Sequence, residues 1–257
     1  MKLVTWNVNG IRARKEYLEM YLDACAPDVL CVQEIKALPE VVPIEIFTSR
    51  GYTCVFQGQK GFNGVLIASK LPMENVHMGL EGGDDGQARL IGCTVAGIHI
   101  VNLYCPQGQS ADSPKFVYKK SFYDTLISWV QTKHTPTDDL ILLGDFNIAP
   151  FAHDLFNPAL FVNVPTFHPE EHERWNQLLE WGLQDLSTAF LPPGSFTFWD
   201  YKQWAFQKNR GMRIDHFLGT ASILPRVQDV VVRKDFRSPI NDLTPSDHAP
   251  VEMLIQS

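Results

Sequence analysis

The stretch "LILLGDFNIAP" at residues 140–150 joins a buried-strand pattern to polar residues. Leu140–Leu143 is an apolar run that suits a strand with both faces buried, as in the interior of an α/β sheet. Asp145 and Asn147 follow it closely, and Pro150 prevents a regular continuation of the strand. The stretch therefore predicts a central strand that ends in a carboxylate and a carboxamide.

The composition predicts one large folded domain. The 257 residues are 45% hydrophobic and 11% aromatic, which is enough to bury a sizeable core. The sequence has no Gly/Ser/Pro-rich linker, no long block of like charges and no internal repeat. We expect a single domain over residues 1–257.

The cysteines and apolar runs favour a soluble cytoplasmic protein. The cysteines are odd in number and widely spaced, without a C-x-x-C pair, which is typical of buried thiols in a reducing compartment: Cys25, Cys31, Cys54, Cys93 and Cys105. The start "MKLVTWNVNG" has too short an apolar stretch for a signal peptide, and no apolar run is long enough to cross a membrane.

The charge distribution does not decide whether the protein binds a polyanion such as nucleic acid. A net charge of −7 argues against a polyanionic partner, but carboxylates around a metal ion count fully in this sum while being neutralised locally. Basic residues gather at 12–15, 115–120 and 201–213. The last segment mixes cations with Tyr201, Trp204 and Phe206, as nucleic-acid surfaces do, yet a solvated loop explains it equally well.

Strands and helices are expected to alternate along the chain. The expected strands are Lys2–Trp6, Val29–Gln33, Thr53–Phe56, Gly64–Ala68, Leu90–Val95, Ile98–Leu103, Leu140–Leu143, Arg213–Leu218, Val227–Val232 and Val251–Ile255. The expected helices are Arg14–Cys25, Pro114–Val130 with Ser113 as N-cap, and Pro169–Trp181. This order predicts an α/β fold of stacked sheets covered by helices.

Polar residues recur at or near the ends of these strands. They are Asn7, Gln33, Glu34, Tyr104, Asp145, Asn147, Asp215, Asp247 and His248. Each alone is ordinary turn chemistry, but a sheet brings its strand ends side by side. The carboxylates and amides offer mainly oxygen atoms, which are the ligands that Mg²⁺ or Mn²⁺ prefers and zinc does not.

The segments that carry these residues resemble a known family. "TWNVNGIR", "CVQEIK", "NLYCPQG", "GDFNIAP", "NRGMRID" and "PSDHAP", in this order, are similar to the exonuclease III family of metal-dependent DNA repair nucleases, within the DNase I-like endonuclease/exonuclease/phosphatase superfamily. The resemblance runs from Lys2 to about Leu254, and residues 60–70 and 196–202 narrow it to the DNA-acting branch. It implies a four-layer α/β sandwich, two mixed sheets face to face with helices outside, and one site at an edge.

The resemblance also implies a metal and a base. Glu34 would be the principal ligand of Mg²⁺ or Mn²⁺, with Asn7 and Asp247 near it and Asp145 and Asn147 completing the set. Asp145 would accept the proton of the attacking water, and Asn147 would orient that water and the phosphate.

Three further residues would act on the phosphate. His248, oriented by Asp215, would polarise the scissile group, and Tyr104 would donate a hydrogen bond to it. Without these companions, Asp215 would be interpreted as the ion-pair partner of Arg213, and Tyr104 as an ordinary sheet aromatic.

The substrate is predicted from the same resemblance. A pocket for a base-free deoxyribose flipped out of the duplex, with its DNA contacts, would be formed by Phe198, Trp199, Asn209, Met212, Arg213 and Ile214. His168 and Asp200 would crowd this pocket with bulk and negative charge. We therefore expect 3′→5′ exonuclease and 3′-end cleaning activity to be at least as prominent as incision at abasic sites.

The sequence thus predicts a metal-dependent phosphodiesterase of base-excision repair that acts on double-stranded DNA with abasic sites or 3′ ends, as a monomer. Three alternatives remain: a mainly abasic-site endonuclease, a phosphatase of the same fold, and an inactive DNA-binding module. The tryptophan-rich segment 196–213 disfavours the phosphatase. The presence of every catalytic residue type disfavours the inactive module.

Overall fold

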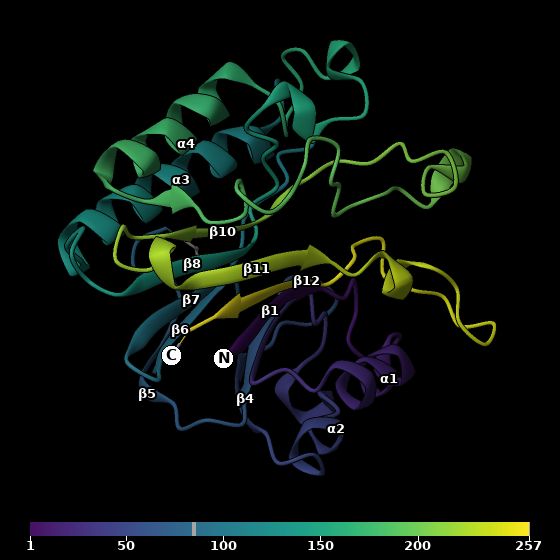
Figure 1. Ribbon diagram of the computed structural model, residues 1–257. Coiled ribbons are helices and arrows are strands. Elements are labelled where there is room, and N and C mark those ends of the chain that lie inside the picture. Colours follow the sequence, from purple (N-terminus) through teal and green to yellow (C-terminus); the bar gives the residue numbers. More distant parts are fainter. Residues whose placement is uncertain (84–85, 257) are drawn as a thin grey trace.

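Two β-sheets pack face to face in the computed structural model, which describes residues 1–83 and 86–256 (Figure 1). The first sheet has the order β11-β12-β1-β2-β4-β3, with bounds Val227–Val232, Val251–Ile255, Lys2–Asn7, Val29–Gln33, Val65–Ser69 and Thr53–Gln57. The second has the order β5-β6-β7-β8-β10-β9, with bounds Glu74–Met78, Leu90–Val95, Ile98–Tyr104, Leu140–Asp145, Asp215–Gly219 and Gln184–Asp185. Both sheets are mixed, because β1 runs parallel to β2 and β7 parallel to β8.

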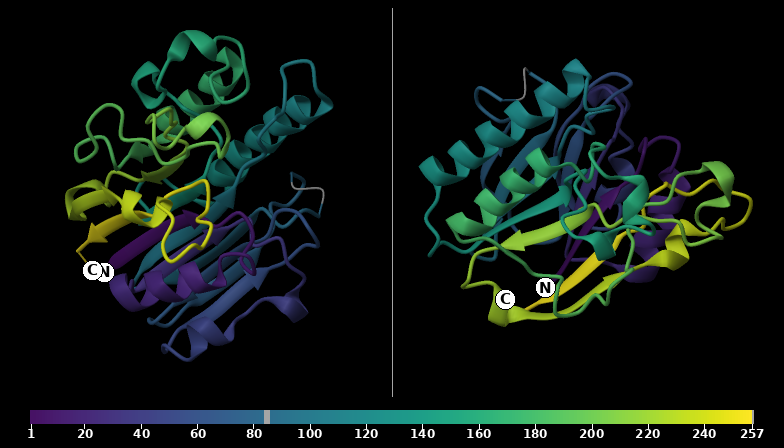
Figure 2. Two further views of the ribbon diagram at one scale, coloured as in Figure 1. Left: turned by 90° about the vertical axis from the view of Figure 1, so that its right-hand side faces the viewer. Right: turned by 90° about the horizontal axis from the view of Figure 1, so that it is seen from above.

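Helices cover the outer face of each sheet (Figure 2). The α-helices are α1 (Lys15–Cys25) and α2 (Glu45–Thr48) on the first sheet, and α3 (Pro114–Lys133) and α4 (Pro169–Trp181) on the second. Short 3₁₀ helices occupy the connections: η1 (Pro39–Val41), η2 (Ala152–Asp154), η3 (Pro158–Leu160), η4 (Lys202–Trp204), η5 (Leu224–Arg226) and η6 (Lys234–Arg237). The predicted four-layer α/β sandwich is confirmed.

Strand β8 is buried on both faces, as its sequence predicts. Ile141 and Leu143 lie in the core between the sheets, whereas Leu140 and Leu142 pack toward α3 and α4. Successive side chains of a strand point to opposite faces, so a continuous apolar run fits a strand with a core on each side.

The strand register aligns polar residues across the second sheet. Asp145 pairs with Tyr104 of β7 on one side and with Asp215 of β10 on the other. Gly144 permits this close arrangement: its φ is +136°, and a Cβ there would lie 2.0 Å from the carbonyl oxygen of Leu103. Only glycine fits this position without a shift of the neighbouring strand.

The expected strands are all present, and their ends lie within two residues of the predicted positions. The predicted strand at Arg213 begins at Asp215 instead, and the predicted helix at Pro114 extends to Lys133. The sequence analysis missed β5, whose polar residues form an exposed edge strand, and the very short β9 and α2. Ser113 caps α3 by accepting a hydrogen bond from the backbone nitrogen of Lys115, at 3.1 Å.

The five cysteines are free thiols, and all but the half-buried Cys54 are buried. Across residues 1–83 and 86–256, none of the helices has the length and apolar character that a bilayer crossing needs.

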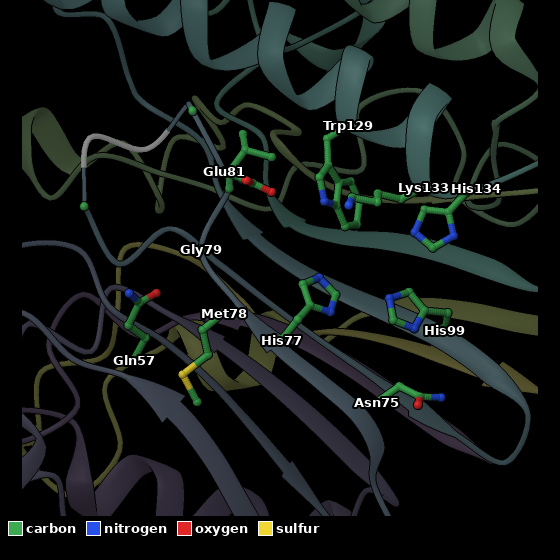
Figure 3. A pocket seen from close by; sticks show the side chains of 13 residues that line it. Gln57, Asn75, His77, Met78, Gly79, Glu81, His99, Trp129, Lys133 and His134 are labelled. Atoms are coloured by element: carbon green, nitrogen blue, oxygen red, sulfur yellow. The ribbon is translucent and has the colours of Figure 1, made fainter.

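Three histidine rings lie in a row between the second sheet and α3 (Figure 3). His77 stacks on His99 with ring centroids 5.2 Å apart, and His99 lies 5.1 Å from His134. They line a cavity of about 740 Å³ together with Trp129. Burial lowers the pKa of all three rings, that of His99 to about 4. The row is therefore neutral at pH 7.

This row predicts an acid-sensitive contribution to stability. Between pH 6.5 and about 4 the unfolded chain binds a proton at position 99 that the folded chain does not, so the free energy of unfolding falls as the pH falls. The variant His99→Gln removes the share of this slope that belongs to His99, on the order of 2 kcal/mol over the window, while His77 and His134 keep theirs. Urea unfolding from pH 7 to 4 measures it, with the exposed His153→Gln as control. Equal pH dependence in His99→Gln and the unaltered protein would contradict it.

Candidate active site

The polar strand ends meet in one cavity at an edge of the two sheets. Its volume is about 150 Å³, and it is lined by Glu34, Tyr104, Gln107, Asp145, Asn147, Thr166, Phe198, Met212, Ile214, Asp247 and His248. The loops that complete this edge project on the right of Figure 1 and contain residues 150–167, 198–212 and 234–248. Gln33, which the strand-end pattern also selected, instead donates a hydrogen bond to Asn102 of the opposite sheet, at 2.6 Å.

Glu34 is held in place by two donors. Asn7 Nδ2 donates to Glu34 Oε1 at 2.7 Å, and Lys36 Nζ pairs with Glu34 Oε2 at 2.5 Å. Burial alone would raise the pKa of Glu34, but Lys36 and Asn7 lower it, so this carboxylate is ionised. The φ of Glu34 is +53°, a left-handed conformation that costs a non-glycine residue energy and often accompanies functional sites.

Asp145 lies at the centre of the cavity. Its Oδ2 accepts a hydrogen bond from Asn7 Nδ2 at 2.8 Å, and its Oδ1 accepts one from the backbone of Asn147 at 2.9 Å. Complete burial raises the pKa of Asp145, and the carboxylates of Asp215 and Glu34 add to this rise. The group is therefore poised to accept a proton.

His248 lies between two carboxylates. Its Nδ1 is 2.8 Å from Asp215 Oδ2, and its Nε2 is 3.8 Å from Asp145 Oδ2. Burial lowers the pKa of His248, but the facing carboxylates of Asp215 and Asp145 outweigh burial and raise it. Thr197 Oγ1 donates to Asp215 Oδ2 at 2.6 Å and fixes this carboxylate. The ring is therefore a protonated donor whose Nε2 faces the cavity.

Asn147 and Tyr104 present a carboxamide and a hydroxyl to the cavity. Asn147 Nδ2 donates to the carbonyl oxygen of Cys105 at 3.0 Å, and its φ is +52°. Burial raises the pKa of Tyr104, and the neighbouring carboxylates of Glu34 and Asp145 raise it further, so its hydroxyl keeps its proton. Both side chains are oriented before any substrate binds.

Asp247 joins the set through a residue that the sequence analysis missed. Asn9 Nδ2 donates to Asp247 Oδ1 at 3.0 Å, while Asn9 Oδ1 accepts from Lys36 Nζ at 2.5 Å. Asn9 and Lys36 thus connect Asp247 to Glu34. The sequence held one indication of their role, because Asn9 lies two residues after Asn7 and Lys36 lies two residues after Glu34.

The donor set fits a hard divalent cation. Glu34, Asp145 and Asp247 offer carboxylate oxygens with the Asn7 amide beside them, and no cysteine lines the cavity. Oxygen ligands of this kind suit Mg²⁺ or Mn²⁺ better than zinc. Burial is the main cause of the raised pKa of Asp145, and the carboxylates of Asp215 and Glu34 add a repulsion that a cation would relieve.

A buried ion pair supports the loops of the cavity. Lys119 of α3 and Glu171 of α4 are 0% and 1% exposed and form a salt bridge. Lys119 Nζ also donates to the carbonyl oxygen of Asn147 at 2.7 Å, and Glu171 accepts from the backbone nitrogen of Thr166 at 2.8 Å. The sequence analysis placed Lys119 and Glu171 only inside two expected helices, and the pattern of a surface helix gave no signal that either residue is buried.

The predicted wall of the sugar pocket is only partly at the cavity. Phe198, Met212 and Ile214 line it, and the Phe198 ring lies 4.9 Å from that of His248. Trp199 is 0% exposed in a separate core cluster, and Arg213 pairs with Asp154 and Asp185, at 2.6 and 2.7 Å. Side chains of extended backbone alternate in direction, so the immediate neighbours of wall residues face away.

Three other predicted contacts also lie outside this cavity. Asn209 accepts a hydrogen bond from the Trp199 indole at 3.3 Å. His168 is the N-cap of α4: its Nδ1 accepts from the backbone of Glu170 at 3.2 Å, and its ring packs against Phe116. Asp200 Oδ1 accepts a hydrogen bond from the backbone nitrogen of Lys202 at 2.8 Å, and Asp200 lines a neighbouring cleft.

The fold and the cavity define a class of protein. A buried carboxylate beside a histidine and a group of carboxylate and amide oxygens, at one edge of a four-layer sandwich, are elements that phosphoester hydrolases use.

Comparison with known proteins gives the family. The sequence profile of the endonuclease/exonuclease/phosphatase family matches residues 4–248, so the chain belongs to this family, whose enzymes depend on divalent metal ions. A curated relative, exodeoxyribonuclease III of Haemophilus influenzae, is 33% identical, and the match covers 98% of each chain.

Comparison with solved structures supports the same family assignment. A Neisseria enzyme, described as a 3′–5′ exonuclease in one structure and as a 3′ phosphatase bound to a product DNA hairpin in another, is 36% identical over 100% of both chains, with TM-scores of 0.94 and 0.93. An AP endonuclease from Archaeoglobus fulgidus is 33% identical over 100% of both chains, with a TM-score of 0.94.

The buried ion pair gives a prediction with a matched control. Lys119→Met leaves Glu171 buried without a partner and should lower the free energy of unfolding by about 3–5 kcal/mol. Lys120→Met removes the neighbouring pair with Glu170, which is partly exposed, and should cost at most about 1 kcal/mol. Urea unfolding at pH 7 measures both. Equal losses in the two variants would show that Lys119 does not support the site.

Proposed function

We propose that the protein is a divalent-metal-dependent DNA repair nuclease that hydrolyses phosphoester bonds at the 3′ ends of double-stranded DNA. The single observation that carries this proposal is the buried Asp145, which faces His248 Nε2 at 3.8 Å and shares its cavity with Glu34. The names of the relatives, which include exodeoxyribonuclease III, 3′–5′ exonuclease and AP endonuclease, support DNA as the substrate.

Asp145 acts as the base. It accepts a proton from a water molecule, whose oxygen attacks phosphorus as the bond to the leaving oxygen breaks; the leaving oxygen then takes up a proton. The raised pKa of Asp145 suits this role at neutral pH. Asn147, held by Cys105 and Lys119, orients the water and the phosphate.

His248 and Tyr104 bind the phosphate as donors. His248 is kept in its protonated form by Asp215, so Nε2–H can donate to a phosphate oxygen while negative charge develops. Tyr104 donates its hydroxyl proton in the same way. Thr197 acts indirectly, because it positions Asp215.

Glu34 would be the principal ligand of Mg²⁺ or Mn²⁺, with Asn7 and Asp247 near it and Asp145 and Asn147 at the border of the site. When bound, the cation neutralises phosphate charge and stabilises the leaving oxygen. Lys36 keeps Glu34 ionised for this purpose.

The preferred substrates are double-stranded DNA ends, with 3′→5′ exonuclease and 3′-end cleaning activity ahead of abasic-site incision. The Neisseria enzyme described by these activities shares 36% of its residues with this chain, against 33% for the AP endonuclease. The margin is small, so mainly abasic-site incision is the alternative within the family. The protein acts as a monomer in the cytoplasm, where its free thiols stay reduced.

The role of Asp145 predicts a separation of binding from turnover. Asp145→Asn should lower the cleavage rate of a recessed 3′ end by at least about a thousandfold, because the base is lost. Binding should stay equal or become tighter, because a negative charge near the phosphate is removed. Gel assays and fluorescence anisotropy measure the two quantities, with Asp229→Asn, at an exposed position of β11 away from the cavity, as control. Turnover within tenfold of the unaltered protein would exclude Asp145 as the base.

The substrate preference is tested with two matched duplexes. One carries a recessed 3′ end, and the other carries a single internal tetrahydrofuran, an abasic-site analogue. We expect kcat/KM with Mg²⁺ to be higher for the recessed end. A higher value for the tetrahydrofuran duplex would establish the abasic-site alternative.

A further inference from the structure

A cleft of about 660 Å³ adjoins the catalytic cavity and shares two of its walls, Phe198 and Met212. The catalytic cavity measures only about 150 Å³, below the range of about 300–1,000 Å³ typical of sites for whole small molecules. It offers room for the reacting phosphate and sugar but not for a complete nucleotide. A nucleotide that still carries its base needs additional space, and the nearest such space is the cleft on the other side of Phe198 and Met212.

Aromatic and aliphatic side chains line this cleft. Phe156 and Phe161 meet edge to face with ring centroids 5.8 Å apart, and Leu160 lies beside them with 62% of its surface exposed. The opposite side is formed by Phe198 and Met212. An apolar cleft that opens to solvent is one signature of a binding site. Flat aromatic rings favour a flat ligand, because every nucleobase can stack on them regardless of its identity.

The walls are fixed to the active site by the backbone. Met212 is bridged to Phe198 on one side and to Leu155 on the other, and the backbone nitrogen of Phe156 donates to the carbonyl oxygen of Gly211 at 3.1 Å. The cleft and the catalytic cavity are therefore parts of one framework, and a ligand in the cleft lies at a fixed position relative to His248.

The rim of the cleft carries cations suited to a phosphate backbone. Lys202 and Arg210 are exposed, and among residues 1–83 and 86–256 neither side chain forms an ion pair. Asp200 is also at the rim, but its Oδ1 is engaged by the backbone nitrogen of Lys202 at 2.8 Å. Two free cations around an apolar floor match the end of a DNA duplex, with an unpaired base inside the cleft and other phosphates of the backbone at the rim.

We propose that this cleft binds the unpaired base of the 3′-terminal nucleotide while the phosphate on its 5′ side lies in the catalytic cavity. The proposal rests on the proposed function. It adds that the enzyme recognises the terminal base itself, through this cleft. A base-free terminal nucleotide, or a simple 3′-phosphate, has no group to place there. The cleft therefore favours the exonuclease reaction specifically.

A comparison of two termini and two variants tests this proposal. Duplexes with a recessed 3′ end terminate in either a deoxyadenosine nucleotide or a tetrahydrofuran nucleotide, and kcat/KM for release of the terminal nucleotide is measured with Mg²⁺. Phe161→Ala should lower kcat/KM about tenfold for the deoxyadenosine terminus, because one stacking surface is lost, and less than twofold for the tetrahydrofuran terminus. Val162→Ala, at an exposed neighbour outside the cleft, should change neither value. Equal losses on both termini, or no loss on either, would overturn the proposal.

Two further measurements keep the test decisive. Leu160→Ala, at an exposed cleft residue, repeats the comparison in case Phe161→Ala unfolds. The fluorescence of 2-aminopurine at the 3′ terminus is then recorded in EDTA, where turnover is not required. Quenching by the unaltered protein that is lost in the cleft variant supports binding of the base in the cleft. If this result is obtained but no terminus is cleaved, the proposed function fails and the binding proposal stands. An absence of quenching by the unaltered protein contradicts the cleft.

Discussion

The crowding of carboxylates at one sheet edge is the constraint on which the rest of the structure depends. Glu34, Asp145 and Asp215 contribute negative charge to a largely buried region, where like charges repel strongly. The fold compensates with two groups that each serve two carboxylates: Asn7 donates to both Glu34 and Asp145, and His248 lies between Asp145 and Asp215. The charge that remains uncompensated is the physical basis of the proton acceptance and cation binding that we propose for this site.

Rigid supports keep these groups from relaxing apart. The register across β7, β8 and β10 sets the positions of the central residues, and Gly144 allows the strands to approach each other. Behind the site, the buried Lys119–Glu171 pair fixes the backbone at Asn147 and Thr166. The left-handed backbone of Glu34 and Asn147 is tolerated because the surrounding hydrogen bonds determine these conformations.

The sequence predicted the central strands and the residues at their ends, because an apolar run that ends in a carboxylate indicates a buried strand and its edge. It did not predict side-chain direction in irregular segments. Trp199 and Arg213 lie next to wall residues but point into the core and into an ion pair, respectively. Nor did it predict Lys119, because burial of a lysine depends on a partner fifty-two positions away in the chain, Glu171, that only the packing of α3 on α4 reveals.

The central claim is that the carboxylate cluster hydrolyses DNA with the help of a divalent cation, and metal dependence tests it most directly. A duplex with a recessed 3′ end is incubated with the protein in Mg²⁺, then in EDTA, and then after Mg²⁺ is restored, and the products are resolved at single-nucleotide resolution. We expect stepwise shortening from the 3′ end that stops in EDTA and resumes with Mg²⁺. Cleavage that continues unchanged in EDTA, or no cleavage under any of these conditions, would contradict the account.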